Sequence, residues 1–419
     1  MRVLLVNTSE KVGGAAIACN RLMNALNRHG VEAKMYVRDK QTDNDAVTQL
    51  ASRWTLPLKF LWERLVIFLN NGLRKRDVFQ VDIANVGTDI THTEEFHNAD
   101  VVHLHWGNQG FLSLSNLNDI IHSGKKVIVT LHDQWYFTGI CHYSAECDKY
   151  TIQCADCHLI KGGVIDLARR VFERKRNMYR DANITFVGCS RWMADLARKS
   201  VLTKGHTVVN IPNAIDTDLF CPGIAEEQRM KRNFPLDKKL IFFNAQRITD
   251  ERKGFCYFAE ACNIITKCNA EFAKQIAVVV LGGDSAKAAA LLPFPVFAVP
   301  YISDVQEMID TYRAVDLFVT PSLQDNLPNT IVEAMSCGVP CVGFNVGGIS
   351  EMIDHKVNGY VAEYKSADDF AKGIIWTLDD SRYSALANAA RSMAVRTYSE
   401  QVVAGKYLEI YDYNSNGNI

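Results

Sequence analysis

The sequence predicts an α/β protein made of two Rossmann-like, doubly wound domains that face each other across a cleft. In the first half of the chain, short apolar runs alternate with stretches of helical periodicity, as in RVLLVN followed by AAIACNRLMNALNRHG. This is the pattern of a parallel sheet covered by helices. The alternation restarts after residue 206, where KLIFFNAQR, IAVVVLGGD and DLFVTPS read as strands. The length of 419 residues is sufficient for two such domains, each with its own core.

The remaining strand candidates indicate where the domains divide. DVVHLHW, KVIVTLH and NITFVGCS complete the first set, and VFAVPY and PCVGFN complete the second. We expect a first domain over residues 1–205, a second over residues 206–395, and a terminal helix over residues 396–419 that crosses back to the first. Ligands of doubly wound sheets bind at the carboxyl ends of the strands, so the loops at those ends are the candidate functional segments.

The charge balance argues against one class of partner and favours another. The net charge is −1 and charged residues make up 22% of the chain, so no overall field attracts nucleic acid and we expect no nucleic-acid partner. The distribution is uneven, because residues 1–205 hold 27 basic and 21 acidic side chains and the remainder holds 19 and 26. The first domain therefore favours an anionic partner.

The N-terminus begins directly with a strand pattern, MRVLLVN, and lacks the apolar stretch and cleavage site of a signal peptide. No apolar run reaches the length of a membrane span. We therefore expect a cytoplasmic protein whose twelve cysteines are mostly reduced.

The segment WTLPLKFLWERLVIFLNNGLRKR, residues 54–76, has two interpretations. It is apolar and aromatic, is interrupted by Lys59, Glu63 and Arg64, and ends in three basic residues. Such a helix can lie on an anionic membrane surface. It can equally be an amphipathic helix packed on its own domain, and the sequence favours neither. LARRVFERKRNMYR, residues 167–180, is a second basic helix with the same two interpretations.

The stretch PSLQDNLPNTIVEAMSCGVP, residues 321–340, places two acids around the start of a short helix. The first-turn residues Asn329 and Thr330 present backbone amides that, with the helix dipole, suit a phosphate. Glu333 lies about one turn further and can accept hydrogen bonds from vicinal hydroxyls, while Asp325 can meet another part of the same ligand. The alternative is an exposed acid and a charge that merely stabilises the helix.

Basic residues and glycines elsewhere favour the ligand interpretation. NAQRITDERKG follows a strand of the second domain and offers Arg247, Arg252 and Lys253 to a diphosphate. KVGGAAIACNRL places Gly13 and Gly14 before the first helix, where the backbone can approach a ligand closely. Each cation alone can be a solvated surface charge, and the dinucleotide fingerprint GxGxxG is absent.

Together these residues resemble the retaining nucleotide-sugar glycosyltransferases of family 4, which have the GT-B fold. The resemblance runs from GGAA to the terminal helix, and its most specific element is the pair of acids inside PS...EAM.CG.P. It implies an acceptor-side first domain and a donor-binding second domain. Glu333 would hold the nucleotide ribose, Asp325 would approach hydroxyls of the donor sugar, and Arg247 with Lys253 would hold the diphosphate. The family normally has a second glutamate where this chain has Asp325, an acid one methylene shorter.

The resemblance also implies a histidine beside the transferred sugar, and VIVTLHDQW places His132 at that position. His103 and His105, in VVHLHW, share one strand face and also approach the strand end. For these two, a structural role in a buried strand is the alternative. Ser190, in VGCSRW, resembles a further position that lines the donor site.

Two other features follow from the resemblance. Gly347 and Gly348, in NVGGISEMI, correspond to family positions that line the cleft. The family transfers sugar with retained anomeric configuration and usually without bound metal, so no cofactor is expected for catalysis. The leaving phosphate itself would assist deprotonation of the acceptor, and we assign no general base.

A cysteine-rich insertion at residues 141–158, CHYSAECDKYTIQCADCH, carries Cys141, Cys147, Cys154 and Cys157. Four close thiols with one CxxC pair can bind a structural zinc, and reduced, unliganded thiols are the alternative. The segment resembles a subgroup associated with bacterial surface polysaccharide assembly (exopolysaccharide, capsule or O-antigen). That subgroup implies a glycan or lipid-linked oligosaccharide acceptor and a peripheral position on the inner face of the cell membrane.

Two other functions are compatible with the sequence. A nucleotide-sugar epimerase of the same architecture would bind a donor without needing an acceptor. A nucleotide-sugar binding protein with weak or lost catalysis would explain the shortened acid at Asp325. Product analysis separates the three, because only a transferase joins the sugar to a second molecule.

Overall fold

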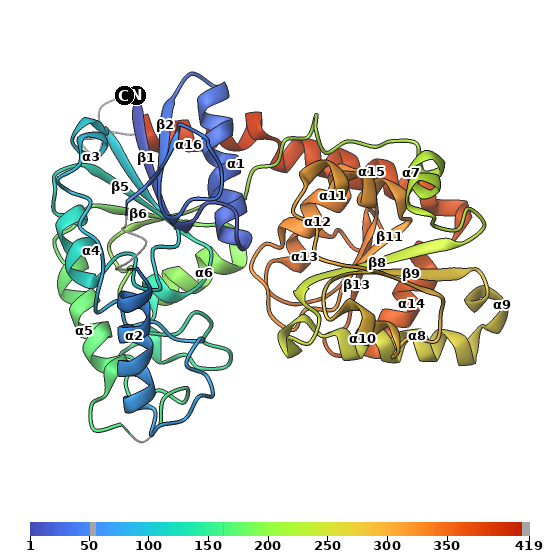
Figure 1. Ribbon diagram of the computed structural model, residues 1–419, viewed down its shortest axis with the longest axis horizontal. Helices are drawn as coiled ribbons and strands as arrows, with labels where there is room; N and C mark the ends of the chain where they lie inside the picture. The colour runs from blue at the N-terminus through green and yellow to red at the C-terminus, as the bar shows by residue number, and fades with distance from the viewer. Residues whose placement is uncertain (51–55, 162, 413–419) are drawn as a thin grey trace. The chain divides into compact units, whose positions relative to one another are not determined.

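The computed structural model describes residues 1–50, 56–161 and 163–412 and divides into two compact α/β units (Figure 1). Unit 1 comprises Met1–Ala214 and the chain from Val403 on, and unit 2 comprises Ile215–Val402. Each unit contains one parallel sheet with helices packed on it. The predicted pair of Rossmann-like domains is therefore confirmed.

Seven parallel strands form the sheet of unit 1, in the order β3-β2-β1-β4-β5-β6-β7. Alternate residues of β1 face two separate cores: Val3 and Leu5 share one with α1 and α16, while Leu4 and Val6 share the other with α4 and α5. Helices thus cover both faces, which explains why the strands read as continuous apolar runs. The strands are β1 (Arg2–Ser9), β2 (Glu32–Asp39), β3 (Val47–Gln49), β4 (Val101–Leu104), β5 (Lys126–Leu131), β6 (Ile184–Gly188) and β7 (Thr207–Asn210).

The helices of unit 1 follow the strands in sequence, and the last one comes from the end of the chain. Two single-turn 3₁₀ helices, Trp135–Phe137 and Lys149–Thr151, lie in the segment between β5 and β6. The α-helices are α1 (Gly14–Arg28), α2 (Leu56–Asn70), α3 (Glu94–Asn98), α4 (Leu114–Ile121), α5 (Leu167–Tyr179), α6 (Arg191–Lys199) and α16 (Glu400–Asp412).

Six parallel strands form the sheet of unit 2, in the order β10-β9-β8-β11-β12-β13. They are β8 (Lys239–Arg247), β9 (Ile276–Gly283), β10 (Val296–Val299), β11 (Leu317–Thr320), β12 (Cys341–Phe344) and β13 (Gly359–Ala362). The helices are α7 (Ala225–Arg232), α8 (Phe255–Cys268), α9 (Ala270–Ala273), α10 (Ser285–Ala289), α11 (Val305–Ala314), α12 (Asn329–Ser336), α13 (Ile349–Met352), α14 (Ala367–Thr377) and α15 (Asp380–Tyr398), with a 3₁₀ turn at Glu251–Lys253.

The unit boundaries lie later in the chain than the sequence predicts. Unit 1 extends past residue 205 to Ala214, because β7 pairs with β6 and completes the first sheet. Likewise, α15 continues past residue 395 within unit 2, and the helix that returns to unit 1 is α16. Both shifts have the same cause. The pairing of an edge strand and the length of a helix depend on contacts with residues distant in sequence, which the local pattern does not reveal.

A row of buried hydrogen bonds attaches α16 to the sheet of unit 1. On β4, the Nδ1 atom of His103 lies 2.7 Å from the Tyr411 hydroxyl, and its Nε2 atom lies 2.7 Å from the Thr130 hydroxyl. The Tyr407 hydroxyl lies 3.1 Å from the same Thr130 oxygen. His103 is therefore a structural histidine, the alternative that the sequence left open.

A buried lysine holds the loop that follows β5. Lys175 of α5 is fully buried, and its Nζ atom donates to the carbonyl oxygens of Trp135 (2.5 Å) and Gly139 (3.1 Å). The same Nζ lies 3.4 Å from the centroid of a ring of the Trp135 indole. Carbonyls and an aromatic face are the partners that a buried ammonium group needs, so this loop has one fixed path out of the sheet.

The buried histidines of unit 1 predict a pH-dependent stability. Burial lowers the pKa of His103 to about 3 and that of His132 to about 4, and it lowers the pKa of His105 well below its usual value. Below about pH 6.5, the unfolded chain therefore binds protons on these histidines that folded unit 1 does not. As pH falls from about 6.5 to about 5, we expect the free energy of unfolding, measured by urea denaturation, to decrease. Each histidine that stays neutral contributes up to about 1.4 kcal/mol per pH unit.

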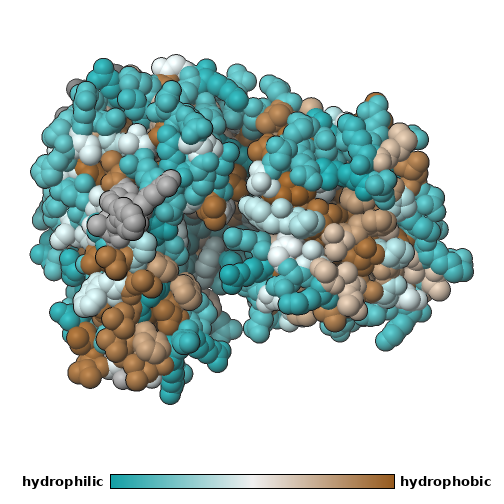
Figure 2. Space-filling model, viewed as in Figure 1, coloured by the Kyte–Doolittle hydropathy of each residue, from teal (hydrophilic) through white to brown (hydrophobic). Residues whose placement is uncertain are grey.

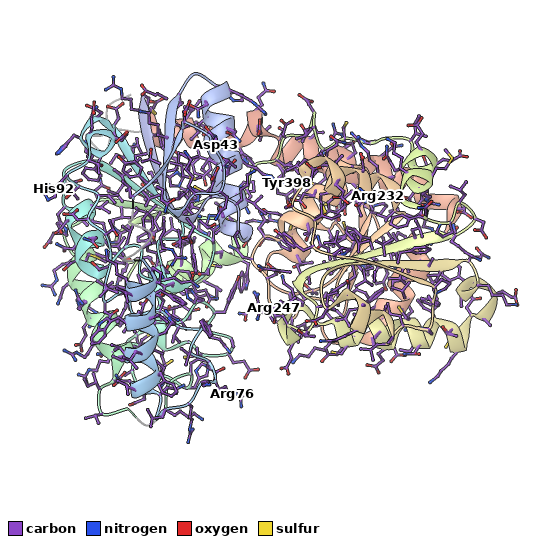
Figure 3. All side chains as sticks on the ribbon, in the orientation of Figure 1. Asp43, Arg76, His92, Arg232, Arg247 and Tyr398 are labelled. Atoms are coloured by element: carbon purple, nitrogen blue, oxygen red, sulfur yellow. The ribbon has the colours of Figure 1, made fainter. Side chains whose placement is uncertain are left out.

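Two variants make this measurement specific. His103→Gln removes one of these three histidines and should reduce the pH slope. His92→Gln, at a side chain that is 87% exposed and is labelled in Figure 3, should leave the slope unchanged. Identical slopes in the wild-type protein and both variants would contradict the assignment.

Candidate functional site

The strand order of unit 2 reverses between β8 and β11, which lie side by side in the sheet. From β8 the chain adds β9 and β10 on one side, and it then returns to add β11, β12 and β13 on the other. Ligands of open α/β sheets bind at the carboxyl ends of the strands at such a reversal. The loops that leave β8 and β11 carry Lys253 and Asp325, so both predicted residues lie at the expected position.

Lys253 and Asp325 form an ion pair with each other. The Lys253 Nζ atom lies 2.7 Å from the Asp325 Oδ2 atom, and both side chains are largely buried. The sequence assigned them to different parts of a ligand, the diphosphate and the sugar. The structure adds that the cation and the carboxylate are direct neighbours, so a bound anion would compete with Asp325 for the ammonium group.

Two glycines allow the loops around this pair to pack closely. Gly254 has a φ of +67°, and a Cβ atom there would lie 1.9 Å from the carbonyl oxygen of Pro321. Gly347 has a φ of +59°, and a Cβ atom there would lie 1.9 Å from the carbonyl oxygen of Asp325, which also accepts from the Gly348 amide at 3.2 Å. Any other residue would force these loops apart. Gly347 and Gly348, which the sequence predicts to line the site, therefore lie against the backbone of Asp325.

Glu333 is the fifth of the eight residues of α12 and is 6% exposed. The Tyr312 hydroxyl, on α11, donates to its Oε2 atom at 2.9 Å. This hydrogen bond fixes the carboxylate against the inner side of the unit and so orients its other oxygen. Sequence reasoning did not find Tyr312, because helix periodicity alone does not reveal which residue of one helix meets a given residue of another.

Further cations and a helix N-terminus accompany the pair. Arg247 ends β8 with its side chain exposed, and Figure 3 shows it extending from the sheet. Arg252 contacts Asp250, with Nη2 at 3.4 Å from Oδ2. Asn329 and Thr330 form the first turn of α12 and are half-buried, and Pro328 before them provides no side-chain cap. Positive side chains and a helix N-terminus on one edge suit a diphosphate.

In unit 1, His132 follows β5 and is half-buried. Its Nε2 atom lies 2.8 Å from Nδ1 of His105, which follows β4, and its Nδ1 atom lies 3.6 Å from Sγ of Cys189. Burial lowers the pKa of His132 to about 4, and the negative charge of the nearby Asp133 only partly opposes this decrease. The imidazole is therefore neutral near pH 7 and can exchange hydrogen bonds without carrying a charge. His105 is the partner that orients the His132 ring. The sequence places both histidines at strand ends but does not specify that their rings contact each other.

Asp133, the next residue, connects three segments at the same edge of the sheet. Its carboxylate accepts from the Trp106 indole Nε1 at 2.7 Å and from the Trp135 amide at 2.9 Å, and His142 Nδ1 lies 2.7 Å from Oδ2. Burial alone would lower the pKa of His142, but the charge and hydrogen bond of Asp133 outweigh it and raise the pKa. The first residues of the cysteine-rich insertion are thus attached to the loop that carries His132.

The other candidates of unit 1 lie at strand ends of the same sheet. Gly13 has a φ of +96° and precedes Gly14, the first residue of α1, and both are exposed, so the backbone here is accessible. Ser190 is buried and caps α6, where its hydroxyl accepts from the Met193 amide at 3.0 Å. Its observed role is therefore helix capping.

The four cysteines of the insertion have free thiols. Cys141 and Cys154 are buried, and burial raises the pKa of the first to about 12 and of the second to about 11. The Cys154 sulfur accepts from the Gly139 amide at 3.3 Å. Within residues 1–50, 56–161 and 163–412, no group of three or more His, Cys, Asp or Glu side chains is placed to hold a metal ion. The structural zinc stays a prediction.

Two family models match the chain, one in each half. The model described as Glycosyltransferase Family 4 matches residues 12–219, and the model described as Glycosyl transferases group 1 matches residues 238–380. The first covers the strand ends that carry Gly13, His132 and Ser190, and the second covers the loops that carry Lys253, Asp325 and Glu333.

Two curated relatives have names that specify their reactions. One is the N,N'-diacetylbacillosaminyl-diphospho-undecaprenol alpha-1,3-N-acetylgalactosaminyltransferase of Campylobacter jejuni, 28% identical over 54% of this chain and 60% of its own length. The other is the UDP-Gal:alpha-D-GlcNAc-diphosphoundecaprenol alpha-1,3-galactosyltransferase of Escherichia coli, 24% identical over 48% of this chain and 53% of its own length. The chain thus spans little more than half the length of these relatives.

Solved structures match over almost the whole length. The sucrose-phosphate synthase of Thermosynechococcus elongatus aligns with a TM-score of 0.66 at 17% identity, covering 98% of each chain. Anabaena HepE, in complex with UDP-glucose, aligns with a TM-score of 0.65 at 15% identity, covering 98% of this chain and 99% of that one. At such identities the likeness concerns the fold. With the family models and the two parallel sheets, it identifies the chain as a member of glycosyltransferase family 4 with the GT-B fold.

Proposed function

We propose that the protein is a retaining glycosyltransferase that moves a sugar from a nucleoside-diphosphate sugar to a lipid-linked glycan. The observation that carries the proposal is the site at the strand reversal of unit 2, where Lys253, Asp325 and the Glu333 carboxylate lie on loops and a helix fixed by close backbone contacts. The printed names of the two relatives support a diphosphoundecaprenol-linked acceptor.

Each residue of unit 2 has a role that its geometry supports. Glu333, oriented by Tyr312, accepts hydrogen bonds from the ribose hydroxyls of the donor. Arg247 and Lys253, with the N-terminus of α12, stabilise the negative charge that develops on the leaving diphosphate. Asp325 accepts from hydroxyls of the donor sugar once the diphosphate takes over the Lys253 ammonium group. Cations and helix amides of this kind stabilise a leaving diphosphate, as a divalent metal ion does in other sites that act on phosphates.

In unit 1, His132 is the residue we assign to the transferred sugar. A neutral imidazole held by His105 can hydrogen-bond a sugar hydroxyl near the anomeric centre without attracting the diphosphate. The bond between the anomeric carbon and the phosphate oxygen breaks, and the acceptor oxygen bonds to the anomeric carbon on the same face, while its proton passes to the departing phosphate. This step needs no nucleophile from the protein and results in retained configuration.

The lipid-linked acceptor sets the place of the reaction. A diphosphate-linked lipid stays in the bilayer, so the enzyme has to meet it at the inner face of the cell membrane, where nucleotide sugars are available. We therefore propose a cytoplasmic protein that associates peripherally with that face. Assembly of a surface polysaccharide is the process that such a reaction serves.

One experiment tests the function directly. The full chain is incubated with radiolabelled nucleotide sugars and a membrane extract that contains lipid-linked glycans, and the label is expected in the organic-extractable fraction, also in the presence of EDTA. The new linkage should have the anomeric configuration of the donor. Label in a changed free sugar would indicate an epimerase instead, and tight nucleotide binding without any transfer would indicate a binding protein.

Glu333→Gln should weaken nucleotide binding by roughly 10- to 100-fold, because a hydrogen bond to a charged group contributes about 1.5–3 kcal/mol. Calorimetry with UDP or GDP, whichever the wild-type protein binds more tightly, measures the change. Tyr312→Phe should cause a smaller loss, since it removes only the orienting hydrogen bond. Glu271→Gln, at an 81% exposed side chain of the same unit, serves as the matched control. Wild-type affinity in Glu333→Gln would remove Glu333 from the site.

The Lys253–Asp325 pair predicts opposite effects of its two members on nucleotide binding. Lys253→Ala should weaken binding about tenfold or more, whereas Asp325→Asn should leave it equal or tighter, because the ammonium group loses a competing anion. Asp325→Asn should nevertheless lower the transfer rate by about 10- to 100-fold. Lys274→Ala, on the exposed surface of unit 2, is the control. Equal loss of binding in both variants would mean that Asp325 only supports the loop.

A further inference from the structure

On α2, two charged residues face the interior of unit 1 together with Ile67, whereas most of the leucines face outward. Glu63 is fully buried and Arg64 is 8% exposed, although both lie in the middle of the helix. A surface helix in water has the opposite arrangement, with its apolar stripe against the core. The second interpretation of the segment at residues 54–76, an amphipathic helix packed on its own domain, therefore holds for one side of α2, where Ile67 joins the core of unit 1, but it leaves the exposed apolar side unexplained. Residues 54 and 55 lie outside the described residues.

Specific partners hold the charged side of α2 inward. The Arg64 guanidinium donates to the Val78 carbonyl oxygen at 2.6 Å and to Oδ2 of Asp82 at 3.1 Å. The Glu63 Oε1 atom accepts from the Ala84 amide at 2.6 Å. Because these groups are buried and hydrogen-bonded within unit 1, α2 has a fixed rotation about its axis, and its outer side cannot turn inward.

The outer side of α2 is a continuous apolar surface, which we call the α2 face. Its residues recur at helical spacing, are each between 45% and 67% exposed, and extend one turn beyond the helix; they are Leu58, Leu61, Trp62, Leu65, Leu69 and Leu73. Figure 2 shows hydrophobic residues gathered over the region of α2. Phe79, which is 68% exposed and stacks on Phe60 with centroids 6.4 Å apart, adjoins the face.

A basic segment borders the α2 face. Arg74, Lys75 and Arg76 follow directly after Leu73 and are exposed. The Arg76 side chain is 90% exposed, and Figure 3 labels it in the part of unit 1 that holds the end of α2. An apolar strip with a tryptophan and adjoining cations matches the layers of an anionic bilayer, with acyl chains inside and negative headgroups at the surface.

We propose that the α2 face docks unit 1 onto an anionic lipid bilayer. Leu61, Trp62 and Leu65 enter the boundary between headgroups and acyl chains, and residues 74–76 contact the headgroup phosphates. Over the described part of the chain, no helix is both long and apolar enough to cross a membrane, so α2 lies in the plane of the surface. This assignment deepens the proposed function, on which it rests for the identity of a membrane-held acceptor, and the lipid contact itself requires no catalysis.

Flotation with vesicles tests the docking surface. The full chain should bind phosphatidylcholine vesicles that contain phosphatidylglycerol, and bind pure phosphatidylcholine vesicles much less. The triple variant Leu61→Gln, Trp62→Gln and Leu65→Gln should lose binding at least about tenfold. Replacement of Arg74, Lys75 and Arg76 by serine should weaken it by about fivefold per residue at low salt. The double variant Leu236→Gln and Leu291→Gln changes similarly exposed leucines of unit 2 and should bind like the wild type.

A second measurement reports insertion itself. Brominated phosphatidylcholine, mixed with phosphatidylglycerol, should quench tryptophan fluorescence in the wild-type protein and quench it less in Trp62→Phe. Circular dichroism verifies that each variant is folded. Equal flotation of the wild type and the triple variant, or no preference for phosphatidylglycerol, would overturn the proposal.

Two further measurements distinguish lipid docking from self-association and from the proposed function. If analytical ultracentrifugation found a dimer that the triple variant dissociates, and no lipid binding, the α2 face would be an interface with a second copy and the proposal would be overturned. Nucleotide binding by the triple variant should equal that of the wild type. Nucleotide binding and transfer without vesicle binding would refute the docking surface alone, whereas vesicle binding without any transfer would refute the proposed function and leave the docking surface supported.

Discussion

The parallel direction of every strand is the constraint on which the rest of this molecule depends. In each sheet all carboxyl ends point to one edge, so loops far apart in sequence are collected there without any further device. In unit 2 this edge brings the turn after β8 against the turn after β11, where the Leu323 amide donates to the Arg252 carbonyl at 2.8 Å. In unit 1 it brings His105 beside His132. The candidate site residues thus lie mainly on loops, and within each unit the sheet holds these loops in fixed positions relative to one another.

The parallel strands also account for the long segment that contains α2. Parallel strands need crossover connections, and the long one from β3 to β4 contains α2 and the buried acid Asp82. Removing one partner of a buried ion pair costs about 3–5 kcal/mol, so the pair that Arg64 forms with Asp82 fixes the rotation of the helix strongly. Burying a large apolar side chain contributes about 1.5–3 kcal/mol, and the α2 face leaves several such contributions unused in water. Burying these exposed side chains against a partner would therefore lower the free energy, so the α2 face is suited to binding one.

The sequence predicted the parts of this structure that follow from local pattern. The apolar runs specified the strands, and their alternation with helices specified two parallel sheets. Asp325 and Lys253 were predicted in loops after strands and Glu333 in a short helix, and they lie there. It did not predict partners that depend on side chains meeting across the fold, such as Tyr312 with Glu333. The apolar periodicity of residues 54–76 was also visible, but which side faces inward depends on Asp82 and the Ala84 amide, whose approach no local pattern encodes.

The ion pair between Lys253 and Asp325 gives the shortened acid a physical meaning. The Asp325 carbonyl accepts from the Gly348 amide and lies against Gly347, so the backbone position from which this side chain extends is fixed. An aspartate reaches Lys253 at 2.7 Å, whereas a glutamate would project its charge one methylene further into the site. The pair is therefore nearly neutral before a ligand arrives, and in the proposed function the exposed Arg247 is the cation that first meets a diphosphate. In the proposed function, phosphate oxygens that approach Lys253 become the partners of its ammonium group, and the Asp325 carboxylate is then available to a hydroxyl of the donor sugar.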